Sequence, residues 1–173
     1  MAWEAVSAGA AVLAAGAAAW QLRQLRRDAL EARAAEIASV SVATTVIFKP
    51  RDAEVREGRA DWTYGYTINN PGRLPVSDVD VTIQYGCEVR RRRGREYDPP
   101  TSTLYLTASV VPPHSSHPSR ERILSVAKED WSRLSEATIT VSFIAPDVGR
   151  CTTTWPARDH RTNNALQKVL TRR

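Results

Sequence analysis

The strictest pattern in this sequence is an alternation of apolar and polar side chains over residues 78–85, at a period of two. Only an extended strand places every second side chain on one face, so this period constrains the segment to β structure. Polar residues on the other face indicate a sheet that is buried on one side only, as is typical of antiparallel sheets. The residues predicted to point inward are Val79, Val81, Ile83 and Tyr85.

The same period recurs in other short segments. The predicted strands cover residues 40–48, 62–68, 78–85, 104–111, 120–125 and 137–144, with a last strand ending near Trp155. The face predicted for the first strand consists of Val40, Val42, Thr44, Val46 and Phe48. Short strands separated by turn signals predict a mainly β protein with an antiparallel sandwich.

Two connections carry local signals of their own. Pro71 followed by Gly72 predicts a type II turn, because Pro suits the first central position and Gly tolerates the positive φ of the second. A short helical turn is expected over residues 128–134.

Ahead of the strands, residues 5–20 form an uncharged run flanked by Trp3 and Trp20. A helix between these tryptophans covers roughly 27 Å, close to the thickness of the hydrocarbon core of a bilayer. We therefore predict a transmembrane helix over residues 1–20, continued by a helical stalk over residues 21–39. The residues expected at the membrane interfaces are Trp3, Trp20, Arg23, Arg26 and Arg27.

Three alternatives compete with a membrane span. A secretory signal peptide requires a basic start, whereas the only early charge is Glu4. An Ala-rich soluble helix is consistent with the high helix propensity of alanine. An interfacial helix needs a polar face, which this segment largely lacks.

The basic flank on the C-terminal side of the run places the β domain in the cytoplasm, since such flanks stay inside. The expected location is the cell membrane, crossed once. Gly9 and Gly16 lie on one helix face and offer a strip for self-association. In a reducing cytoplasm Cys87 and Cys151 are expected to be buried small hydrophobes. An extracytoplasmic sandwich, by contrast, allows a bridge between them.

Residues 64–83 read YGYTINNPGRLPVSDVDVTI, and residues 110–116 read VVPPHSS. These segments resemble immunoglobulin-like sandwich modules of bacteria, and with the N-terminal helix the chain resembles small single-span membrane proteins of high-GC bacteria whose function is uncharacterised. The resemblance implies an immunoglobulin-like sandwich and carries over no catalytic residue. The expected organisation is a transmembrane helix, a stalk, a sandwich and a C-terminal helix or tail, over residues 1–20, 21–39, 40–158 and 159–173.

The densest charge in the chain is a run of five arginines that follows a predicted strand: Arg90, Arg91, Arg92, Arg93 and Arg95. Such a run can contact phosphates of anionic lipids or of nucleic acid. Of the 24 basic residues only three are lysines, which indicates a genome-wide preference for arginine and lowers the weight of each one. A solvated loop or hairpin tip is the alternative. Nucleic acid is not a favoured partner, because Tyr97 is the only aromatic side chain beside the run.

No pattern in the sequence predicts a catalytic centre or a cofactor site. The spacing of His114 and His117 suits a metal, but no nearby Cys or carboxylate completes a ligand set. The chain lacks a G-x-S-x-G nucleophile motif and a phosphate-binding glycine loop. We therefore expect no enzyme, no cofactor and no metal.

The leading functional hypothesis is a single-pass, membrane-anchored β-sandwich that binds another protein as an adaptor. The alternative is a peripheral protein that binds anionic lipid or nucleic acid through the run from Arg90 to Arg95.

Overall fold

The computed structural model describes residues 2–156, and the side chains from residue 15 onward. The chain divides into two units, residues 1–38 and 39–173, and each is described by itself. The predicted helix or tail over residues 159–173 lies outside the described residues.

The first unit is a single helix, α1 (Ala2–Ala38), in which alanine is the commonest residue and favours this conformation. The pair Arg27–Glu31, at 3.0 Å with an i,i+4 spacing, adds the modest support expected of such pairs on an exposed helix. Trp20 and the three arginines at 23, 26 and 27 are exposed. Within residues 2–156, no helix combines the length and the apolar character that crossing a bilayer requires.

The second unit is mainly β. Its strands are β1 (Ser41–Phe48), β2 (Arg59–Asn70), β3 (Val76–Arg93), β4 (Glu96–Tyr97), β5 (Thr101–Val111), β6 (Ser115–Pro118), β7 (Arg122–Ala127), β8 (Thr138–Ala145) and β9 (Gly149–Pro156). Two 3₁₀ segments join them, η1 (Asp52–Glu54) before β2 and η2 (Lys128–Glu136) before β8. The expected helical turn at 128–134 is therefore confirmed.

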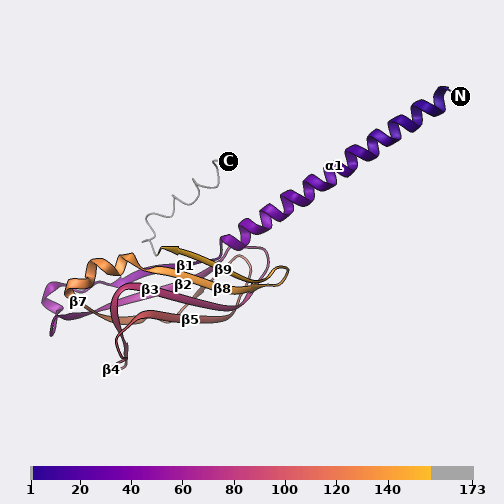
Figure 1. Ribbon diagram of the computed structural model, residues 1–173. Coiled ribbons are helices and arrows are strands. Elements are labelled where there is room, and N and C mark those ends of the chain that lie inside the picture. The colour runs from indigo at the N-terminus through magenta and orange to yellow at the C-terminus, as the bar shows by residue number, and fades with distance from the viewer. Residues whose placement is uncertain (1, 157–173) are drawn as a thin grey trace. The chain divides into compact units, whose positions relative to one another are not determined.

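All pairings between these strands are antiparallel, and they form one sheet in the order β1-β2-β7-β3-β8-β9, with β5 and β4 also on β3 and β6 also on β2. The long strand β3 pairs with β8 and β5 along residues 76–84 and with β7 at residues 89–91. Because one strand belongs to both parts, the sheet curls over and encloses the core (Figure 1).

The inward face of β3 confirms the sequence prediction: Val79, Val81 and Ile83 are each 1% exposed, and Tyr85 is 6% exposed. The hydroxyl of Tyr85 is hydrogen-bonded to the hydroxyl of Tyr66 on β2 at 2.5 Å. Each of these two buried polar groups therefore has a hydrogen-bond partner in the core. Phe143, Ile139 and Leu124 complete the packing around them as fully buried side chains.

Two local predictions are wrong. Val46 and Phe48 are 45% and 46% exposed, because β1 is an edge strand and a β-bulge between them breaks the alternation. Gly72 does not adopt the positive φ of a type II turn. Its N–H donates instead to the side-chain Oδ1 of Asn70 at 3.1 Å, so an Asx turn takes the place of the backbone turn.

Candidate anion-binding groove

A groove with a volume of about 740 Å³ runs over the outer face of the curled sheet, where β2, β7 and β3 lie side by side. Asp61, Ser125 and Arg90 are in register across these strands, on the face opposite the buried Trp62 and Leu124. The charged side chains that line the groove are five arginines and three carboxylates: Arg56, Arg59, Arg90, Arg92, Arg95, Glu54, Glu57 and Asp61. Arginine therefore dominates its charge.

The tight turn before β2 places two of these arginines together. Glu57 and Gly58 both have positive φ, 51° and 76°, as a type I′ turn requires. The N–H of Arg56 donates to the carbonyl of Arg59 at 2.8 Å, and the reverse bond measures 2.9 Å. Residues paired in this way project their side chains to the same side of the ribbon, and both side chains line the groove.

The strand period divides the predicted arginine run between two faces. Arg90 to Arg93 are part of β3 rather than a loop, and Gly94 makes the turn to β4 with a φ of 66°. Successive side chains of a strand point to opposite faces, so Arg90 and Arg92 line the groove and Arg91 does not. Arg95 follows the turn and joins the groove. The hairpin stands out from the sheet at the label β4 in Figure 1.

Asp61 holds one side of the groove in place. Its carboxylate accepts a hydrogen bond from the guanidinium of Arg92 at 3.0 Å and from the hydroxyl of Tyr97 at 3.0 Å. Arg59 is held by Ser125, to whose carbonyl it donates at 2.7 Å. The contacts of Asp61 tie the hairpin to β2, and the contact of Arg59 ties β2 to β7.

The remaining three arginines of the groove keep their hydrogen-bonding capacity. The side chains of Arg56, Arg90 and Arg95 make no hydrogen bond or ion pair with any other group among the described residues. An arginine presents five N–H donors in a planar fork that matches carboxylate and phosphate oxygens. The groove therefore offers three unused forks to an anion.

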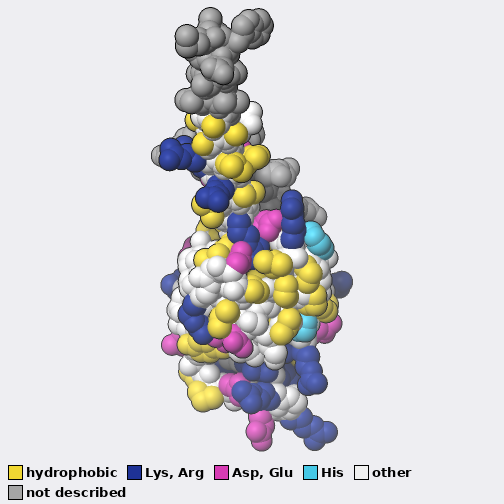
Figure 2. Space-filling model, turned by 90° about the vertical axis from the view of Figure 1, so that its right-hand side faces the viewer, with side chains coloured by type: hydrophobic (Ala, Val, Ile, Leu, Met, Phe, Trp, Pro, Cys, Tyr) yellow, Lys and Arg dark blue, Asp and Glu magenta, His cyan; other side chains and the backbone are white. Residues whose placement is uncertain are grey.

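The other face of the hairpin is also basic. Burial, and then the neighbouring Arg91, Arg120 and Arg93, lower the pKa of Arg122. Arg93 is paired with Asp98 at 2.9 Å. The run from Arg90 to Arg95 thus contributes to two separate surfaces, and only three of its five members meet in the groove. Figure 2 shows basic side chains, in dark blue, at the bottom of the view, with acidic ones among them.

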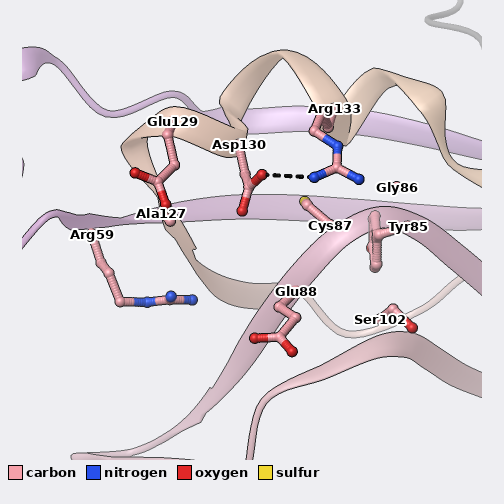
Figure 3. Close-up of a pocket in the computed structure, with 10 residues that line it drawn as sticks. All are labelled: Arg59, Tyr85, Gly86, Cys87, Glu88, Ser102, Ala127, Glu129, Asp130 and Arg133. Atoms are coloured by element: carbon pink, nitrogen blue, oxygen red, sulfur yellow. Dashed lines mark hydrogen bonds and ion pairs between the residues drawn. The ribbon is translucent and has the colours of Figure 1, made fainter.

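A second pocket, of about 380 Å³, contains Cys87 (Figure 3). Its two arginines, Arg59 and Arg133, face three carboxylates from Glu88, Glu129 and Asp130, and Asp130 pairs with Arg133 at 3.1 Å. Burial, and then Asp130, raise the pKa of the Cys87 thiol, so it stays protonated at neutral pH. A protonated thiol is a weak nucleophile, and this pocket offers no excess positive charge for an anion.

The other candidate residues are dispersed. His114 lies in the turn after β5 and His117 lies on β6. Within the described part of the chain, no three His, Cys, Asp or Glu side chains are close enough to hold a metal ion. Cys87 is buried and Cys151 is partly exposed on the edge strand β9, and both are free.

Sequence reasoning missed Arg56, Arg59 and Phe48, which the fold adds to the groove. A signal for the first two was present in Arg56-Glu57-Gly58-Arg59, since a residue pair ending in Gly marks a tight hairpin turn. Phe48 had no such signal, because its alternation predicted burial.

The chain is a mainly β protein with an antiparallel, curled sheet and an N-terminal helix. No protein-family model matches it. No curated protein matches it either.

Solved structures show distant likeness only. The Escherichia coli curli protein CsgC aligns with 10% identity and a TM-score of 0.32, over 67% of this chain and 99% of its own. The sporulation control protein Spo0M of Bacillus subtilis aligns with 8% identity and a TM-score of 0.30, over 69% of this chain and 49% of its own. An uncharacterised β-sandwich protein from Clostridium difficile aligns with 12% identity and a TM-score of 0.21, over 67% and 80%. Likeness at this level carries no inference about function.

Proposed function

We propose that the protein is a non-enzymatic binding module that holds phosphate-bearing anions in the groove over β2, β7 and β3. The observation that carries this proposal is the set of three arginines, Arg56, Arg90 and Arg95, that line one groove without a partner among the described residues. The backbone of each belongs to a strand or a tight turn, which fixes where the three side chains start.

The surrounding charges favour an anion as well. The five arginines of the groove exceed its three carboxylates by two, and one carboxylate, Asp61, is already engaged with Arg92 and Tyr97. Phosphate is the anion that best matches several arginine forks at once, because it presents multiple oxygens and carries more than one charge. The net charge of the whole chain, +5, adds attraction at long range.

The test is a calorimetric titration of the full chain with tripolyphosphate at low salt. Replacing Arg56, Arg90 and Arg95 together with glutamine is expected to weaken binding by about a hundredfold or more, because charge-assisted hydrogen bonds contribute roughly 1.5–3 kcal/mol each. Binding should also weaken as salt is raised.

The matched control is the triple change Arg23→Gln, Arg26→Gln and Arg150→Gln, which removes the same charge at exposed positions outside the groove. This control should keep nearly all of the affinity. If both triple variants lose affinity equally, net charge rather than the groove explains the binding, and the proposal fails.

We propose that the curled sheet is an immunoglobulin-like sandwich and that the N-terminal helix anchors it at the cytoplasmic face of the cell membrane, as the basic residues at 23, 26 and 27 suggest. A reporter fused after Arg173, followed by fractionation and protease protection, tests both membrane association and sidedness. A soluble reporter would refute the anchor, and a protease-accessible one would refute the orientation. Crosslinking in the membrane tests self-association through Gly9 and Gly16.

A further inference from the structure

The groove contains two half-exposed aromatic rings in addition to its arginines. Phe48 and Tyr97 line it and are each 46% exposed. A binding site for phosphate alone has no use for exposed rings, which lose free energy in water. Two rings in one groove beside unpaired arginines match a ligand that has both anionic and flat apolar parts.

The fold places the two rings on either side of β2. Phe48 ends β1 and is paired with Thr63 of β2. Tyr97 belongs to the hairpin beyond β7, and its hydroxyl reaches Asp61 of β2. Asp61 and Thr63 are two residues apart on the same outward face of that strand, about 7 Å along it. The two rings therefore flank one stretch of the groove floor, with the arginines of β3 and the hairpin beside them.

We propose that this groove binds single-stranded nucleic acid, with phosphates on Arg56, Arg90 and Arg95 and bases stacked on Phe48 and Tyr97. This inference rests on the proposed function and names its ligand. Non-specific single-strand sites combine a basic groove that follows the backbone with aromatic rings on which bases stack. The sequence argued against nucleic acid because Tyr97 was the only aromatic side chain near the arginine run. The fold adds Phe48, which precedes Arg90 by 42 residues in the chain.

A single strand is favoured over a duplex and over a lipid surface. Paired bases are not available for stacking, so a duplex leaves both rings unused. A lipid headgroup presents phosphate but no flat base to a ring that lines a groove.

The experiment measures binding of the full chain to a labelled oligonucleotide of about 12 mixed nucleotides, within the usual range of single-strand site sizes, by fluorescence anisotropy. Phe48→Ala and Tyr97→Ala are each expected to weaken binding by roughly five- to a hundredfold. Tyr97→Phe keeps the ring and loses only the hydroxyl bond to Asp61, so it should retain most of the affinity.

Two controls separate stacking from other effects. Tyr105→Ala removes a tyrosine that is 68% exposed on β5 outside the groove, and binding should not change. An oligonucleotide of the same length without bases should bind the unaltered protein at least fivefold more weakly, at the lower limit for one stacked base.

Several results would contradict single-strand binding in this groove. Equal binding of the abasic and normal strands, tighter binding of a duplex or of anionic phosphatidylglycerol vesicles, or full affinity in both alanine variants overturns the inference. Tripolyphosphate has no bases, so its binding should be unaffected in Phe48→Ala. Retention of tripolyphosphate binding without single-strand binding would therefore overturn this inference and leave the proposed function standing.

Discussion

Replacing Asn70 with alanine is expected to lower the free energy of unfolding by roughly 3–5 kcal/mol, because several buried backbone groups lose their partner at once. Asn70 is 1% exposed. The two hydrogens on its Nδ2 are shared among the carbonyls of Leu74, Val111 and Pro112, at 2.9, 3.1 and 3.1 Å, and its Oδ1 accepts from the N–H of Gly72 at 3.1 Å. One side chain thus joins the end of β2 to the connection before β3 and to the end of β5.

The neighbouring Asn69 provides the matched control. It is only partly buried, and its side chain makes one hydrogen bond within residues 2–156, accepting from the hydroxyl of Ser116 at 2.7 Å. Asn69→Ala should therefore lower the free energy of unfolding by about 1 kcal/mol or less. Asn70→Asp should be at least as harmful as Asn70→Ala, since a carboxylate would face three carbonyl oxygens. Urea unfolding followed by circular dichroism measures all three, and equal stability of the two alanine variants would contradict the assigned role of Asn70.

The free energy of unfolding is expected to fall steeply above about pH 10, where an unfolded tyrosine ionises. Burial, and then its contacts with Tyr66, raise the pKa of Tyr85 well above its ordinary value. Burial likewise raises the pKa of Tyr66, against the lowering effect of its hydrogen bond to Tyr85. The unfolded chain releases these protons first, so stability is complete below about pH 10 and is lost as the pH rises towards the folded-state values. The loss is about 1.4 kcal/mol per pH unit for each tyrosine.

The double change Tyr66→Phe and Tyr85→Phe should remove this contribution to the pH dependence. At neutral pH the double change should lower the free energy of unfolding by less than the sum of the two single changes. Each single change leaves one buried hydroxyl without a hydrogen-bond partner, whereas the double change leaves none. Tyr105→Phe, at an exposed position of β5, serves as the control and should leave the slope unchanged. Urea unfolding at pH 8 to 11 tests the prediction, and an unaltered slope in the double variant would contradict it.

The apolar–polar alternation predicted burial correctly on a strand that has a neighbouring strand on each side. The alternation from Val79 to Tyr85 lies on a central strand, and each of its inward side chains is buried. The same reasoning was wrong for Val46 and Phe48, because period alone does not say that a strand will lie at an edge. The type II turn at Gly72 was wrong for a related reason: the side chain of Asn70, held by distant carbonyls, determines that connection.

The candidate groove shows the same division. The arginine run was visible in the sequence. Once the run is known to be a strand, alternate arginines must point to opposite faces of the sheet. What the sequence did not reveal was that β3 spans 18 residues and passes from β8 to β7. This pairing places Arg90 and Arg92 on the same outer face of the sheet as Asp61 of β2. A strand read from its apolar period ends where the apolar residues end, whereas pairing with β7 and β4 continues it through the arginines.

By itself the sequence determined a mainly β chain behind a helix, the inward residues of its central strand and the position of its densest positive charge, because each follows from neighbours a few residues apart. Only the tertiary structure decided which charges share a surface. Arg56, Arg90 and Phe48 come from separate elements, and they meet because hydrogen bonds join β1, β2, β7 and β3 laterally into one curled sheet. Lateral pairing joins residues that are distant along the chain, and no local period contains that information.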